Sequence, residues 1–125
     1  MFSYKIDKLL GIIFTRVSGT PTCVSMIDHI QNVMNDPDFD TNNNSIIIVE
    51  ENTIIVGIPT NKIETIRRVF DGFAQQGKGR NCAVVAPNKR LEAFLKLNLS
   101  LISPVILNYR IFLNEDDALT WIKEQ

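Results

Sequence analysis

The sequence predicts an α/β fold, and three observations carry that prediction. β-type segments alternate with amphipathic helical segments along most of the chain, which is typical of strand–helix–strand crossovers. The runs 45–49 and 82–86 are almost continuously apolar, as in strands covered on both faces. A β-type run at 105–113 passes directly into a short amphipathic helix. The predicted order is β-β-α-β-(β)-α-β-α-β-α, in a single domain over residues 1–125.

The composition is that of an ordinary globular chain. Its 125 residues are 45% hydrophobic and 22% charged, unlike disordered chains. A formal net charge of −1 gives no long-range field to attract nucleic acid or an anionic membrane. No apolar stretch approaches the roughly 20 residues that span a bilayer. The run 9–14 is too short for a signal-peptide core, so the expected location is the cytoplasm.

The amino-terminal part is expected to form a strand pair. Segments 3–8 and 11–18 are the two predicted strands. Gly11, where the second begins, indicates a hairpin, and Gly19 ends the second strand. The two-residue period of a strand separates the second segment into two faces. One face holds Ile12, Phe14 and Arg16, and the other holds Ile13, Thr15 and Val17.

The first helix is predicted between two prolines. Thr20 is the expected N-cap and Pro21 the first helical residue, where the missing N–H costs nothing. Asp36-Pro37 ends the helix, because a residue before proline avoids the α region. An apolar stripe at helical spacing lies between them, formed by Cys23, Met26, Ile27, Ile30, Val33 and Met34.

The middle of the chain contains a central strand and an ambiguous segment. The run 45–49 is the predicted central strand, and residues 50–52 interrupt it. The β-prone piece 53–58 then has three readings. It extends the strand, forms a strand of its own, or is a loop that packs on the domain, and the sequence leaves the three open.

The second helix is expected to open at 59–61. Asn61 with Glu64 makes one capping pair, and Thr60 is an alternative cap. Its inward residues are expected to be Ile63, Ile66, Phe70 and Phe73. The exit loop at 75–80 includes Gly77-Lys78-Gly79-Arg80, whose cations could clamp a phosphate. That loop precedes a strand, on the side away from the usual ligand sites, and is therefore predicted to be a turn.

The third and fourth helices complete the predicted chain. The third helix is expected to start at 87–88 and end at 103–104. Its core-facing residues are expected to be Leu91, Phe94, Leu95 and Leu99. Asn114 is the expected cap of the fourth. Glu115, Asp116 and Asp117 follow it and complement the helix dipole, which is a simpler reading than a metal site. Trp121 is expected to close the core against the sheet.

Several of these features, taken in order, resemble the STAS/SpoIIAA-like domains, the fold of the anti-sigma factor antagonists. They are a strand ending in Gly19, the turn Asp36-Pro37-Asp38-Phe39, the strands Ser45–Val49 and Ala83–Ala86, and the ending Arg110–Ile122. The resemblance covers roughly residues 10–123 and is to the small stand-alone bacterial SpoIIAA-like proteins. It implies a mixed β-sheet of four to five strands, with about four helices packed mainly on one face.

The resemblance also implies a functional position at the start of the second helix. Members of the signalling branch carry a phosphorylatable Ser or Thr there, in an Asp-Ser-small-Gly pattern that this chain lacks. Thr60 alone occupies a comparable place, where a phosphate would meet helix N–H groups, although a simple cap explains it as well. The predicted partner, ligand or phospho-acceptor surface is therefore Gly57, Ile58, Thr60 and Asn61.

No nucleophile and base converge in the sequence, so no catalytic residue is predicted. His29 is the only histidine, lies off the apolar stripe and is expected to be a solvated helix residue. Cys23 and Cys82 are expected to be buried free thiols. One His and two Cys without paired spacing predict no metal site, and no cofactor is expected.

The chain carries more aliphatic surface than so small a domain needs. Residues 97–107 alternate apolar and small polar side chains, and Ile54, Ile55 and Ile58 add to them. Because exposed apolar patches mark interfaces, a homodimer through 53–58 or the third helix is expected.

Two functions follow from the sequence. The favoured one is a non-catalytic regulatory or protein-interaction domain. The alternative is a domain that binds a small ligand, lipid or nucleotide, in a pocket at the carboxyl ends of the strands. That pocket would lie near Glu50, 56–60, 87–89 and Asn114.

Overall fold

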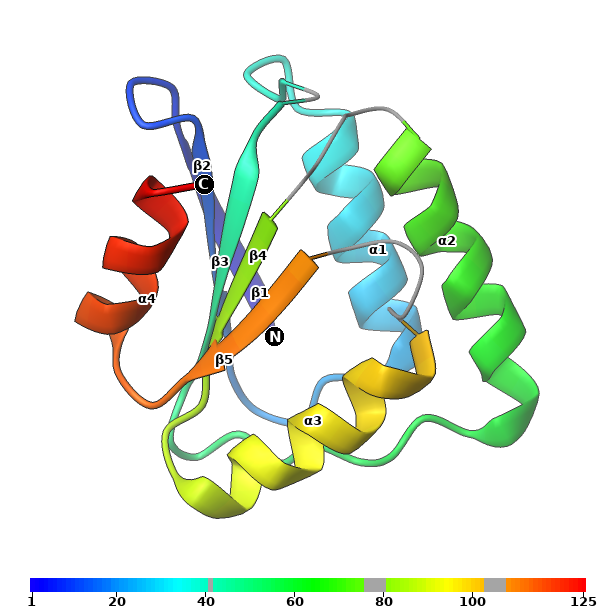
Figure 1. The fold of residues 1–125 in the computed structure, drawn as a ribbon. Coiled ribbons are helices and arrows are strands. Elements are labelled where there is room, and N and C mark those ends of the chain that lie inside the picture. The colour runs from blue at the N-terminus through cyan, green and yellow to red at the C-terminus, as the bar shows by residue number, and fades with distance from the viewer. Residues whose placement is uncertain (41, 76–80, 103–107) are drawn as a thin grey trace.

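The computed structural model describes residues 1–40, 42–75, 81–102 and 108–125, with the side chains of 70–75 and 100–102 outside the description. Five strands form one sheet in the order β1-β2-β3-β4-β5 (Figure 1). They are β1 Phe2–Asp7, β2 Ile12–Val17, β3 Asn44–Val49, β4 Asn81–Val85 and β5 Asn108–Phe112. β1 pairs antiparallel with β2, and the remaining neighbours are parallel. The predicted α/β fold with a mixed sheet is confirmed.

The helices divide unevenly between the two faces of the sheet. They are α1 Cys23–Met34, α2 Ile63–Gln75, α3 Lys89–Ile102 and α4 Glu115–Lys123. From β2 to β5 each crossover steps to the next strand in the same direction. Because such crossovers are right-handed, α1, α2 and α3 must all fall on one face. Figure 1 shows them there, with α4 alone on the other face, so the helices lie mainly on one face as predicted.

The predicted hairpin is confirmed. Its register runs from Asp7 opposite Ile12 to Phe2 opposite Val17. The turn needs Gly11, whose φ of 66° lies in the left-handed region that L side chains avoid. Gly19 has a φ of 71° just beyond the end of β2, which explains why the strand stops there.

The predicted start of α1 is wrong by two residues. Thr22, not Thr20, is the N-cap, and Pro21 precedes the helix. Thr22 Oγ1 accepts a hydrogen bond from the Ser25 amide at 3.1 Å, and Ser25 Oγ accepts one from the Thr22 amide at 2.8 Å. This reciprocal box satisfies two amides at once. Thr20 has Cys23 three residues on, and a thiol is too weak an acceptor to form the same box.

The start of α2 also differs from the prediction. A 3₁₀ turn, η1 Thr60–Lys62, precedes the helix, with Pro59 at its cap position and no side-chain cap bond. Neither predicted cap, the Asn61–Glu64 pair nor Thr60, is therefore formed. The fixed backbone angle of Pro59 positions the chain for this turn without a capping side chain.

The other two helices start where the sequence predicts. Asn88 Oδ1 accepts the Leu91 amide at 2.9 Å where α3 begins. Asn114 Oδ1 accepts the Asp117 amide at 2.8 Å, as predicted for α4. Three predicted features lie outside the described residues. They are the end of α3 at 103–104, the loop 77–80 and the first residues of the last strand, 105–107.

Three structures were left open for segment 53–58. The structure shows a loop that packs on the domain, because no strand is assigned to the segment. The hydroxyl of Thr53 donates to the Val17 carbonyl at 2.9 Å. The Ile54 amide donates to the Gly19 carbonyl at 2.8 Å. These bonds fasten the segment beside the carboxyl end of β2.

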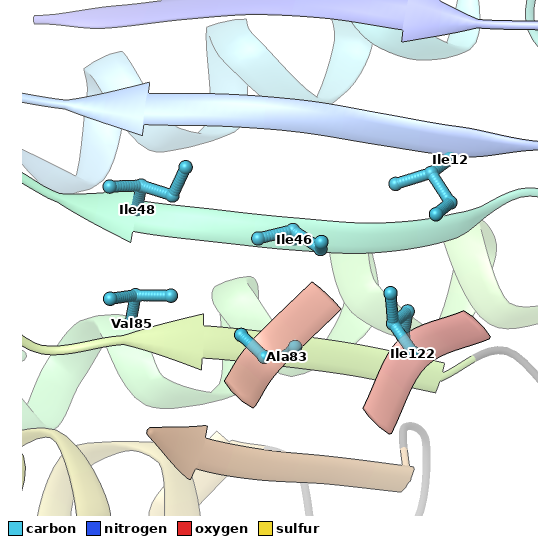
Figure 2. Packing of buried hydrophobic residues seen from close by; sticks show 7 residues of the cluster. Ile12, Ile46, Ile48, Ala83, Val85 and Ile122 are labelled. Atoms are coloured by element: carbon cyan, nitrogen blue, oxygen red, sulfur yellow. The ribbon is translucent and has the colours of Figure 1, made fainter. Parts of the chain in front are cut away.

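The α4 face of the sheet holds a closely packed aliphatic core (Figure 2). Its buried members are Ile12, Ile46, Ile48, Ala83, Val85, Ala118 and Ile122. Trp121 packs on this cluster, with its ring centroid 5.7 Å from that of Phe112. Trp121 therefore closes the core against the sheet, as predicted.

Candidate functional site

The opposite face of the sheet contains a large cavity. It encloses about 650 Å³ between the sheet, α1, α3 and residues 55–59. Protein interiors contain few voids larger than a water molecule. Small-molecule sites, in contrast, enclose about 300 to 1,000 Å³. The cavity therefore has the size of a ligand site rather than that of a packing defect.

The sheet forms the floor of this cavity and the helices form its walls. Floor residues come from one face of three neighbouring strands: Ile13, Thr15 and Val17 of β2, Ser45 and Ile47 of β3, and Cys82 and Val84 of β4. Wall residues include Met26, Ile30 and Val33 of α1 and Leu95 and Leu99 of α3. Most of these side chains are aliphatic, so the described lining offers mainly dispersion contacts to a ligand.

A polar pair stands within this lining. Thr15 is only 2% exposed, and its Oγ1 lies 3.3 Å from Nε2 of His29. Phe2 stacks on the imidazole with ring centroids 4.8 Å apart, and Tyr4 meets it edge-on at 5.8 Å. Burial lowers the pKa of His29 below its ordinary value of 6.5, so the ring is neutral at pH 7.

His29 is half-buried and not the solvated helix residue that was expected. The residue lies off the apolar stripe of α1, but β1 extends the sheet beneath that side of the helix. Phe2 and Tyr4 of β1 therefore cover a position that helical periodicity alone assigns to water. The sequence signal for this burial is the threonine in the inward face of β2, which requires a polar partner.

The cavity opens to solvent beside exposed aliphatic side chains. Val24 and Val56 both line it, and they are 67% and 63% exposed. Ile54 is also exposed, two residues before Val56. We call Val24, Ile54 and Val56 the apolar rim.

The four predicted surface residues separate into two pairs. Gly57 and Ile58 line the cavity, and the Ile58 amide donates to Asn98 Oδ1 of α3 at 3.4 Å. Thr60 and Asn61 are exposed in η1 and are not among the lining residues. The structure therefore brings only the first pair to the candidate site.

The cavity does not lie where the sequence placed a pocket. Residues 56–59 belong to its wall, but Glu50, 87–89 and Asn114 are not among the described lining residues. Glu50 is instead paired with Arg16, which also bonds Glu115 at the start of α4. The cavity lies along the sheet face because β2, β3 and β4 present Thr15, Ser45 and Cys82, which leave more room than larger aliphatic residues would.

The two thiols differ in their surroundings. Cys82 is buried in the cavity floor, and desolvation raises its pKa to about 12, so it stays protonated. Cys23, at the first turn of α1, is only partly buried, which corrects the expectation of a core position. Within the described residues no group of three or more His, Cys, Asp or Glu could hold a metal ion.

Comparisons with family models, with curated proteins and with solved structures found no match to this chain. The resemblance to SpoIIAA-like domains therefore stays a prediction. In the part of the chain that the structure describes, no helix has the length and apolarity needed to cross a bilayer.

Proposed function

We propose that this protein is a non-catalytic binding module for a predominantly apolar small molecule. The single observation that carries the proposal is the cavity of about 650 Å³ between the sheet and α1 and α3. Ligand binding was the alternative function in the sequence analysis, with a pocket at the carboxyl ends of the strands. We place the ligand on the face of the sheet instead.

The energetics favour an apolar occupant. Each 100 Å² of ligand surface taken out of water contributes roughly 2.5 kcal/mol. A ligand also restores the dispersion contacts that side chains facing an empty space lack. These gains offset the entropy lost when a small molecule is immobilised.

The lining supports a lipid-like ligand over a nucleotide. Phosphate recognition uses clustered cations or a row of backbone N–H groups. Among the described lining residues Lys62 is the only cation. Within the described lining, the phosphates of a nucleotide would therefore meet no cluster of cations.

The test is a titration with a fluorescent apolar dye, using two variants on one helix. Leu95 lines the cavity, whereas Leu97 is 65% exposed on the same helix and is not part of the described lining. Leu95→Trp fills the cavity and is expected to weaken dye binding at least tenfold, while Leu97→Trp leaves it unchanged. Equal binding by both variants would contradict the proposal.

A regulatory or interaction role is a second proposal. Ile54, Val56 and Leu97 are exposed aliphatic residues in or near the predicted dimer surfaces, which supports self-association. Thr60 is exposed, which supports access by a kinase. Sedimentation velocity at micromolar concentration tests the dimer, and a monomer alone would rule it out.

A further inference from the structure

The described lining of the cavity includes a polar pair on β2 and α1. Thr15 Oγ1 and His29 Nε2 face each other at 3.3 Å, where the β2 floor of the cavity meets its α1 wall. A hydroxyl has one donor and two acceptor sites, and within the described residues the Thr15 side chain uses only one of them, for His29. A neutral imidazole also carries one donor and one acceptor.

The pair is held rigidly in place. The imidazole lies nearly parallel to Phe2, with 12° between the ring planes. Tyr4 packs against its edge and is itself anchored, because its hydroxyl donates to Asp36 Oδ2 at 2.7 Å. A polar group fixed in this way binds a ligand with little additional loss of entropy.

We propose that the Thr15–His29 pair recognises a single hydroxyl group on an otherwise aliphatic ligand. This inference rests on the proposed function, and it narrows the ligand class to uncharged amphiphiles such as long-chain alcohols. A hydroxyl both donates and accepts, so it satisfies the pair in either tautomer of His29.

The surroundings of the pair select against a charged head group. An ionised carboxylate taken from water into an apolar site is costly unless a cation meets it. The one cation of the described lining, Lys62, belongs to η1 and not to the β2–α1 wall that holds the pair. Within the described lining, a fatty-acid anion therefore lacks a cation beside Thr15.

The experiment compares 1-hexanol with heptane, in which a methyl group replaces the hydroxyl. Both compete with the apolar dye for wild type, Thr15→Val and Thr120→Val at pH 7. Thr15→Val keeps the shape of the side chain but removes its hydroxyl. Thr120→Val is the matched control, since it makes the same substitution at an exposed position of α4, on the opposite face of the sheet.

We expect Thr15→Val to weaken hexanol binding about two- to tenfold, the ordinary worth of one neutral hydrogen bond, and to leave heptane binding unchanged. Thr120→Val should alter neither. If Thr15→Val does not fold, His29→Phe takes its place in the test. It retains the stack on Phe2 and should weaken hexanol binding by a similar factor.

Two results would overturn hydroxyl recognition alone: an equal effect of Thr15→Val on hexanol and heptane, or tighter binding of hexanoate than of hexanol to the wild type. If neither hexanol nor heptane displaces the dye, the proposed function fails together with this inference.

Discussion

The hydroxyl of Tyr4 donates to Asp36 Oδ2 at 2.7 Å and so joins the edge strand β1 to the turn beyond α1. The other oxygen of the same carboxylate accepts the Asp38 amide at 2.8 Å. Asp36 thus shapes the turn beyond α1 and holds Tyr4 beside His29. A residue noticed in the sequence as a helix terminator also supports one wall of the cavity.

This bond should contribute to stability. Tyr4→Phe removes it and is expected to lower the free energy of unfolding by about 1 kcal/mol, somewhat more than a neutral exposed bond because the acceptor is charged. Urea denaturation measures the change. Tyr109→Phe is the control, since the described residues offer its hydroxyl no hydrogen bond, and its effect should stay within about 0.5 kcal/mol. Equal effects of the two substitutions would argue against the assigned role of Tyr4.

Stability should decrease with acidification in two separate ranges. Burial holds the pKa of His29 below 6.5, so the unfolded chain binds this proton first. The contribution of His29 is complete above pH 6.5 and is lost as the pH falls toward the folded-state pKa. The Asp38 amide and the Tyr4 hydroxyl hold the pKa of Asp36 below 3.8, so its contribution is lost only in a more acidic range.

Urea denaturation of wild type and His29→Phe between pH 5 and pH 8 separates the two ranges. The variant should lose the slope near and below pH 6.5, whereas Asp36→Asn should retain it. A wild type whose stability rises as the pH falls from 7 to 5 would have the opposite sign to the one expected.

Glycine matters at the end of β2 because of its backbone angle. At Gly19, with φ at 71°, replacement by alanine should cost about 1–2 kcal/mol. Gly57→Ala is the matched control, because an added Cβ there has its nearest contact at 4.0 Å and no positive φ is required. Its stability should be unchanged or slightly higher. Thermal unfolding of both variants checks the difference, and equal losses would refute the assignment.

The two cysteines should react at different rates. Cys82 is a buried thiol whose pKa is raised to about 12, so a thiol reagent at pH 7.5 should modify Cys23 first. Because Cys23 lines the cavity, saturation with hexanol should slow its modification. Cys23→Ser and Cys82→Ala assign the two rates. Faster reaction of Cys82, or no protection of Cys23, would contradict the placement of these residues.

Periodicity and capping residues predicted most of the fold, because they depend on local chemistry. The cap Asn114 and the start of α3 at 87–88 were predicted, and the two faces of 11–18 are the two faces of β2. The start of α1 was misplaced because Thr20 and Thr22 are both good caps. Only the position of Ser25 decides between them.

The cavity could not be predicted in the same way, because it depends on which residues become lateral neighbours. Ser45 lies beside Cys82 in the register of β3 and β4, and beside Ile13 of β2. Small side chains on adjacent strands leave space that no single strand reveals. The burial of His29 likewise depends on β1 lying beneath α1, a contact between distant segments.

The most direct test of the cavity is methyl NMR of the wild-type protein during titration with heptane. Successive residues of β3 face opposite sides of the sheet, with Ile47 in the cavity floor and Ile46 and Ile48 in the α4 core. We predict saturable shifts for Ile47, and for Val84 of β4, while Ile46 and Ile48 change little. Shifts centred on Ile46 and Ile48, or no saturable shift at all, would contradict ligand binding in this cavity.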